Sequence, residues 1–324
     1  MLQPTECIRS SIEHIQGTDM QLGYRQLFKD PNSQIEYFVL QSTDTSCLCM
    51  QSDLKNFQKL KRAYQSSEFF YPFAKGSILK PLSLNRNSSL NISSAVFENF
   101  DGGFLADFLK VVPPTWQYST GKRIGRILCD IHSYTLNEKQ IVKAHTRHDS
   151  FMEKLAYYIS DLPHFKNDNY ALNAISTRYD HFSIFKSVMR YGSLKHNNIL
   201  ISKDTSLAFI PSFTIGPGDL CEDFANLEIE SAGEYPLLCA GVIDGYFGGN
   251  VPTKFWMHFA LYCALYSLFK CGKRALKNRK DLKKMQSLYD RVCKDFSNFS
   301  RPVPVWYTSP ATEQIRVQAS KHGL

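Results

Sequence analysis

The sequence lacks an apolar run long enough to cross a bilayer, and its first residues do not have the pattern expected of a secretory leader. Its most apolar window, Phe255 to Phe269, is interrupted by His258 and is shorter than the roughly 20 residues that a spanning helix needs. The first fifteen residues contain several ionisable side chains and no apolar stretch. We therefore expect a cytoplasmic protein with no membrane partner, in which the apolar window forms a buried helix.

The sequence also lacks a cysteine pattern that would hold a metal or a disulfide framework. Its nine cysteines, an odd number, are scattered from Cys7 to Cys293. Cys47 and Cys49 form a tight pair, but their spacing suits neither a zinc knuckle nor a redox Cys-x-x-Cys motif. This pattern predicts free thiols in a reducing compartment.

Acidic residues are scarce in one segment near the C-terminal end. The 324 residues carry a formal net charge of +8, and from Lys270 to Lys294 ten cations are matched by only Asp281 and Asp290. Apolar residues recur there at helical spacing, which favours a solvated helix face over a surface for nucleic acid or an acidic partner. No aromatic platform interleaves with the cations, so the sequence indicates no clear nucleic-acid partner.

Hydrophobic periodicity divides the chain into a β-rich first part and a helical second part. The pattern predicts strands at 21–28, 35–40 and 94–100, and helices at 3–16, 52–64, 104–109, 116–134, 150–160, 176–189, 220–231, 233–246, 252–271 and 279–297. A turn at 30–33 joins the first two strands, and Asp101, Gly102 and Gly103 form a hinge between the two parts. Two short strands are expected around a loop at 190–212. Periodicity alone therefore indicates an α+β protein.

Six short motifs follow one another along the chain. They are Val96 to Gly102, Leu128 to His132, Tyr191 to Asn198, Gly218 to Phe224, Ala240 to Phe247 with the Val251-Pro252 and Phe255-Trp256 pairs after it, and Val303 to Tyr307. In this order they resemble the aminoglycoside phosphotransferase and choline kinase family of the protein-kinase-like fold, and more narrowly a bacterial aminoglycoside-phosphotransferase-like group. The resemblance implies one two-lobed α+β domain. Residues 1–100 would form an N-lobe with an antiparallel sheet and a helix, and residues 101–324 a helical C-lobe with a catalytic-loop hairpin at 190–212.

The same resemblance implies a site from which key groups are missing. Asn198 stands where the family's loop Asn binds a metal, but Ser193 stands where an Asp accepts the proton of the attacking hydroxyl. Pro211 replaces the Asp that holds magnesium. Gln41 is the best match for the phosphate-binding Lys, and the following helix, 52–64, contains no Glu to pair with such a Lys.

Two acids and two hinge residues complete the candidate site. In the family, residues matching Asp219 and Asp223 mainly brace the catalytic loop, so this structural role is favoured over a rescued metal site. Glu98 and Phe100 flank the hinge, whose backbone would bind adenine whatever the side chains. That strand therefore cannot show by itself that a nucleotide binds.

Four further polar or aromatic residues have a structural alternative. Lys195 and His196 match residues that the family presents to its substrate cleft, where they would hold a phosphate or an acidic partner; surface exposure without function is the alternative. His132 ends a long amphipathic helix and is expected to be a satisfied core residue rather than a metal ligand. Tyr191 replaces the family's His and is expected to pack against the loop.

Two functional hypotheses follow from these substitutions. Losing a general base costs about 10²–10⁴ in rate, and losing the metal costs several kcal/mol more. The first hypothesis is therefore a pseudokinase that acts as a binding or regulatory module for a small molecule or a protein. The alternative is a phosphotransferase that uses ATP and magnesium, the cofactors that the resemblance implies, with relocated groups drawn from Asp219, Glu222 and Asp223. A transfer reaction with an inverted nucleotide has no support in the sequence.

Overall fold

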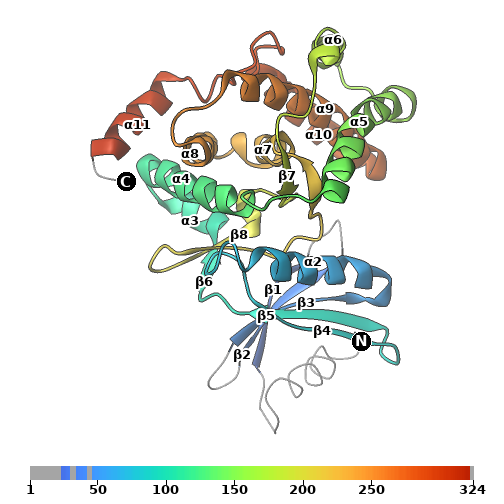
Figure 1. Ribbon diagram of the computed structural model, residues 1–324, viewed down its shortest axis with the longest axis vertical. Helices are drawn as coiled ribbons and strands as arrows, with labels where there is room; N and C mark the ends of the chain where they lie inside the picture. Colours follow the sequence, from blue (N-terminus) through green and yellow to red (C-terminus); the bar gives the residue numbers. More distant parts are fainter. Residues whose placement is uncertain (1–22, 30–33, 42–45, 322–324) are drawn as a thin grey trace. The chain divides into compact units, whose positions relative to one another are not determined.

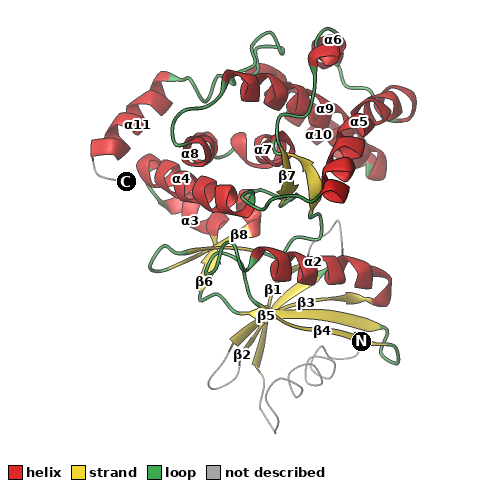
Figure 2. Ribbon diagram, viewed as in Figure 1, coloured by secondary structure: helices red, strands yellow, loops and turns green. Residues whose placement is uncertain are grey.

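The computed structural model describes residues 23–29, 34–41 and 46–321, and the chain divides into two compact units. The first unit consists of Met1–Leu105 and Asn198–Ile215, and the second of Ala106–Asn197 and Gly216–Leu324. Most strands belong to the first unit and most helices to the second (Figure 2). The helix predicted at 3–16 and the turn predicted at 30–33 lie outside the described residues.

The first unit contains an antiparallel sheet whose strands run in the order β1-β2-β3-β5-β4. These strands are β1 (Gly23–Lys29), β2 (Glu36–Gln41), β3 (Ser46–Asp53), β4 (Pro81–Asn87) and β5 (Ile92–Glu98). Helix α2 (Phe57–Phe70) connects β3 to β4 after a 3-10 turn at Leu54–Asn56. A second sheet has the order β6-β8-β9, with β6 (Gly102–Phe104), β8 (Ile199–Ser202) and β9 (Leu207–Phe209). The sequence predicted neither β3 nor β4.

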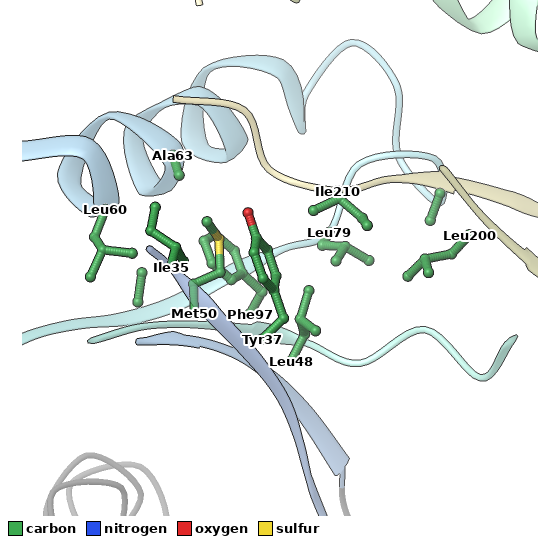
Figure 3. Packing of buried hydrophobic residues seen from close by; sticks show 12 residues of the cluster. Ile35, Tyr37, Leu48, Met50, Leu60, Ala63, Leu79, Phe97, Leu200 and Ile210 are labelled. Atoms are coloured by element: carbon green, nitrogen blue, oxygen red, sulfur yellow. The ribbon is translucent and has the colours of Figure 1, made fainter. Parts of the chain in front are cut away.

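The core of the first unit lies between helix α2 and the large sheet. Leu60 and Ala63 of α2 pack with Met50 of β3 and Phe97 of β5, as Figure 3 shows. The same core takes in Leu200, Ala208 and Ile210, which come from the β8–β9 hairpin. This packing explains why Asn198–Ile215 groups with the first unit, whereas the predicted lobe boundary placed the whole hairpin 190–212 in the helical part.

The second unit is built mainly from helices (Figure 1). They are α3 (Leu105–Val111), α4 (Pro114–Ile131), α5 (Glu138–Asp161), α6 (Asn169–Ser176), α7 (Cys221–Leu227), α8 (Pro236–Phe247), α9 (Thr253–Lys277), α10 (Leu282–Asp295) and α11 (Pro310–Lys321). A π-helical turn, Glu228–Ala232, follows α7. No helix within the described ranges is both long and apolar enough to cross a membrane.

Helices α4 and α8 pack backbone against backbone because each presents glycines four residues apart. These are Gly121 and Gly125 on α4, and Gly241 and Gly245 on α8. A Cβ atom added at any of them would lie 2.0–2.2 Å from a backbone carbonyl oxygen of the other helix. Glycine is therefore required at this crossing for steric reasons.

The helix predicted at 176–189 is wrong. Helix α6 ends at Ser176, and Ser187–Arg190 forms strand β7, which pairs antiparallel with β10 (Gly216–Asp219). A strand partner distant in sequence overrides the local pattern there. The helix predicted at 150–160 is the second half of α5, whose start is fixed by a capping box in which Asn137 and Gln140 each accept a backbone N–H of the other. Helix α11 was not predicted.

Two of the C-terminal sequence motifs meet around a buried acid on α8. The Asp244 carboxylate accepts hydrogen bonds from the hydroxyls of Tyr118 and Tyr307 and from Nε of Arg316, the last at 2.8 Å. Arg316 also lies over the Tyr307 ring, 4.2 Å from its centroid. These contacts attach the C-terminal segment and α11 to the α4–α8 pair.

Candidate functional site

The loop that contains Ser193 is held by one carboxylate of helix α7. Asp223 accepts the backbone N–H of Tyr191 at 2.8 Å and that of Gly192 at 2.7 Å. Gly192 has φ +83°, a left-handed conformation that favours glycine. Tyr191 is buried. The backbone path of the loop is therefore determined by a buried acid on another element.

His132 supports the same acid and is a core residue. Its Nε2 lies 3.2 Å from Asp223, and its Nδ1 lies 3.1 Å from the hydroxyl of Tyr246. Burial lowers the pKa of His132 although Asp223 opposes the shift, so the ring is neutral at pH 7. A carboxylate can only accept, so Nε2–H donates to Asp223 and Nδ1 accepts the Tyr246 O–H. His132 thus has a hydrogen-bond partner at both ring nitrogens.

Asp219 stabilises the antiparallel pair of β7 and β10, which lies next to the loop. It ends β10 with a fully buried side chain, and it accepts the N–H of Phe185 at 2.7 Å and that of Cys221 at 3.0 Å. Burial raises the pKa of Asp219 to about 6, and these backbone donors counteract only part of the shift. Its oxygens are occupied within the protein.

Glu222 lies at the centre of a buried charge cluster that sequence reasoning missed. Nε of Arg147 donates to both carboxylate oxygens at 2.8 Å, the hydroxyl of Tyr266 donates at 2.6 Å, and Nε of Arg190 lies 3.3 Å away. Burial works to raise the pKa of Glu222, but Arg190 and Arg147 outweigh it and lower the pKa to about 2. Arg190 directly precedes the loop, and that position was the only sequence signal for this cluster.

The cluster continues to Lys270, which the sequence placed on a solvated face. Nζ of Lys270 donates to Oδ1 of Asn226 and lies 3.6 Å from the centroid of the Tyr266 ring. Nδ2 of Asn226 in turn donates to the carbonyl of Gly192 at 3.3 Å. Lys270 is therefore joined to the loop through a single amide side chain.

We expect Lys270 to make stability depend on pH in the alkaline range. Burial lowers its folded-state pKa to about 7, so between about 7 and 10.5 the unfolded chain binds more protons than the folded chain. Stability from this group therefore rises with pH across that window. In Lys270→Met the rise is expected to be absent, as measured by urea unfolding at several pH values. Lys273→Met, which removes an exposed lysine of the same helix, is the control and should keep the rise; parallel profiles for the wild type and Lys270→Met would contradict the assignment.

His196 does not have the exposure expected of a residue in a substrate cleft. It is 4% exposed, its Nδ1 lies 2.9 Å from Oγ of Ser231, and its backbone N–H donates to the same hydroxyl. Burial lowers its pKa, so the ring carries no charge at pH 7. The predicted positive character of the loop is therefore left to Lys195, which is half-buried.

The remaining candidates belong to the first unit. The carbonyl of Asn198 accepts the N–H of Ile210 at 3.0 Å, and Pro211 follows as a buried residue. Glu98 ends β5 and is exposed, whereas Phe100 packs against the core. Gln41 ends β2, and its side chain lies outside the described residues.

The predicted relation between Gln41 and the following helix is wrong, because β3 lies between β2 and α2. Strand β3 contains no lysine, and its residues toward α2, Leu48 and Met50, pack in the apolar core. The helix extends to Phe70 and so contains Glu68, which the predicted end at Tyr64 left out. Glu68 is exposed. The face of β3 toward α2 is thus apolar, with no strand lysine for a glutamate of α2 to pair with.

The described ranges contain no group of three or more His, Cys, Asp or Glu side chains that could hold a metal. By resemblance Asn198 is the remaining candidate ligand. A single amide oxygen supplies few of the six or so oxygen ligands that magnesium requires.

No family model and no curated protein matches the chain. Solved aminoglycoside phosphotransferases do match in structure. A mutant of aminoglycoside 2'-phosphotransferase-IIIa in complex with GDP is 12% identical, with a TM-score of 0.66 over 91% of this chain and 98% of that chain. Spectinomycin phosphotransferase in complex with ADP and spectinomycin is 10% identical, with a TM-score of 0.63 over 97% of this chain and 99% of that chain.

A third solved structure, of another aminoglycoside phosphotransferase, is also similar to this chain. A thermostable mutant of aminoglycoside phosphotransferase APH(4)-Ia, in a ternary complex with ADP and hygromycin B, is 12% identical, with a TM-score of 0.63 over 87% of this chain and 96% of that chain. At such low identities the likeness concerns the fold alone. The chain therefore has the α+β, protein-kinase-like fold of the aminoglycoside phosphotransferases.

Proposed function

We propose that this protein is a degenerate aminoglycoside-phosphotransferase-like chain that acts as a binding or regulatory module without phosphoryl transfer. The observation that carries the proposal is that the three acids available to replace the missing ones are all engaged elsewhere. Asp219 and Asp223 accept backbone N–H groups, and Glu222 binds two arginines and a tyrosine. Ser193 is then the side chain at the position of the proton acceptor, and a hydroxyl of ordinary acidity is a poor base at neutral pH.

The apolar interface between β3 and α2 gives independent support. In an active kinase of this type, a strand lysine positioned by a helix glutamate binds the nucleotide phosphates. Here Leu48 and Met50 pack against Leu60 and Ala63 instead. Restoring a charge among these residues would bury it without a partner. Pro211 adds a third loss, because it offers no side-chain oxygen to magnesium.

The proposal predicts that any nucleotide binding is independent of magnesium. The solved neighbours in complex with GDP or ADP indicate a fold that accommodates nucleotides, and a hinge backbone would hold a base without phosphate ligands. A ligand at 100 times its dissociation constant stabilises the folded state by about 2.7 kcal/mol. We expect a thermal-shift titration with ATP to give the same melting temperatures with and without magnesium, for both the wild type and Asn198→Ala.

An active phosphotransferase with relocated groups predicts the opposite result. Magnesium would then increase the shift produced by ATP, Asn198→Ala would remove that increase, and the wild type would release phosphate or phosphorylate an added aminoglycoside. Observing this set of results would overturn the proposal. Adenosine is the control ligand for ATP in this titration, because it retains the adenine base of ATP and lacks the phosphates.

A further inference from the structure

The formal net charge of the whole protein comes from one segment. Residues 270–294 carry ten cations and two acids, a net charge of +8, which equals the net charge of the full chain. All other residues together therefore contain equal numbers of acidic and basic side chains. A charge distribution of this kind produces a local positive field on an otherwise balanced surface.

The structure divides this basic segment into inward and outward cations. Lys270, Arg274 and Arg291 turn toward the π-helical region, where they contact Asn226, Glu230 and Glu228 respectively. The charges of the two arginines are matched by these acids, and burial lowers the pKa of Lys270 to about 7, so that Lys270 is only partly charged at pH 7. These three residues serve the fold, so the unbalanced charge lies on the other cations.

Six of the seven outward cations gather at one end of a helical hairpin; the seventh, Lys294, lies near the other end of α10. Helices α9 and α10 pack together and are joined by the 3-10 turn Arg279–Asp281. Six exposed cations lie in the last turns of α9, in this turn and in the first turn of α10: Lys273, Lys277, Arg279, Lys280, Lys283 and Lys284. We call residues 273–284 the basic corner. Within the described part of the chain, none of the six has a carboxylate within 4 Å.

Two leucines are exposed within the same corner. Leu276 on α9 is 47% exposed, and Leu282 at the start of α10 is 41% exposed. They stand on either side of the connecting turn, among the cations. By contrast, the apolar residues of α10 that pack inward, Met285, Tyr289 and Val292, are buried. The leucines are thus available to a partner, whereas the apolar face of α10 is already covered.

We propose that the basic corner binds the surface of a membrane that contains anionic lipids. Clusters of four to eight lysines and arginines on an amphipathic helix bind acidic headgroups, and apolar side chains of such a helix insert at the boundary of the acyl chains. Nucleic acid would match the charge, but phosphates leave the leucines without an apolar partner and the corner has no exposed aromatic ring for base stacking. A flat lipid surface also requires no groove. This proposal differs from the expectation of no membrane partner, which rested on the absence of a spanning segment; binding to a membrane surface does not need one.

The test uses the full-length protein and sedimentation with vesicles. We expect binding to phosphatidylcholine vesicles that contain phosphatidylserine, weak binding to phosphatidylcholine alone, and a decrease as salt is added. Each cation near such a surface strengthens binding about fivefold, so the triple variant Lys280→Gln, Lys283→Gln, Lys284→Gln should bind about 100-fold more weakly. The matched control changes Lys61, Lys139 and Lys143 to Gln, which alters the net charge equally at exposed positions on other helices and should leave binding almost unchanged.

A second pair of variants distinguishes the membrane from other polyanions. Leu276→Ser and Leu282→Ser should each weaken vesicle binding about fivefold, because less apolar surface is transferred from water. Equal losses in the triple variant and its control, or no dependence on phosphatidylserine, would overturn the proposal. Vesicle binding that the leucine variants leave unchanged would contradict the insertion of the leucines, and tighter binding to duplex DNA or polyglutamate than to the vesicles would overturn the choice of a membrane as the partner. None of these measurements depends on whether the proposed loss of phosphoryl transfer is correct.

Discussion

Replacing Asp223 by Ala is expected to lower the free energy of unfolding by about 4 kcal/mol. The substitution leaves the backbone N–H groups of Tyr191 and Gly192 and the Nε2–H of His132 without their acceptor. A buried donor without a partner costs about 1–3 kcal/mol, and three of them share one site. Denaturant unfolding measures the total loss. Amide hydrogen exchange locates it, because the Tyr191 and Gly192 amides should lose protection before the helices do.

Two variants make the Asp223 result specific. Asp223→Asn keeps one acceptor oxygen and the side-chain volume, so its loss should lie between those of the wild type and the alanine variant. Asp290→Ala removes an exposed acid that accepts a hydrogen bond from the side-chain amide of Gln286, and it should change stability by less than about 0.5 kcal/mol. A loss below about 1 kcal/mol in Asp223→Ala would show that other contacts hold the loop.

The second large effect is expected at the crossing of α4 and α8. In Gly245→Ala the new Cβ would lie 2.0 Å from the carbonyl oxygen of Lys122 and 2.6 Å from its Cα, and both contacts are to backbone atoms. The helices must separate, and overpacking of this kind costs about 1–3 kcal/mol or more. We expect a net loss of about 3 kcal/mol, although alanine is intrinsically better than glycine in a helix by about 1 kcal/mol.

Gly103→Ala is the matched control for this crossing. A Cβ at Gly103 would meet no atom within 4 Å, and its φ is not in the left-handed region. Its stability should stay within about 0.5 kcal/mol of the wild type in the same unfolding experiment. If Gly245→Ala were equally harmless, the two helices would be able to move apart without losing contacts, and the steric argument would fail.

The sequence predicted the loop of the candidate site because local signals there are strong. Gly192 precedes Ser193 in a short motif, and Ile199 to Ile201 form an apolar strand directly after it. Asp219 at the end of β10 and Asp223 on α7 were also found, because the two acids lie at a fixed spacing after that strand. The contacts that the acids of this region make could not be predicted in full, as Glu222 shows. Arg147 reaches Glu222 from α5, a helix far away in the sequence.

Other elements were missed because their stability comes from distant partners. Ser187–Arg190 reads as the end of a helix by local pattern, and it becomes a strand because Gly216–Asp219 pairs with it. Strand β3 has no alternation that separates a strand from a buried helix, since Leu48, Cys49 and Met50 are all buried. The length of α2 was underestimated because Ser66 and Ser67, buried at its far end, look like loop residues in sequence.

Residues Asn198–Ile215 belong to the first unit although they are synthesised long after Leu105. This arrangement affects the order in which the chain can fold on the ribosome. The first unit is incomplete when Leu105 leaves the exit tunnel, since Leu200, Ala208 and Ile210 of its core have not been made. At about 5–20 residues per second, the missing hairpin follows roughly 5–20 s later. During that interval the N-terminal sheet carries an unfinished apolar surface. The first unit can therefore complete its core only after more than half of the chain has been synthesised.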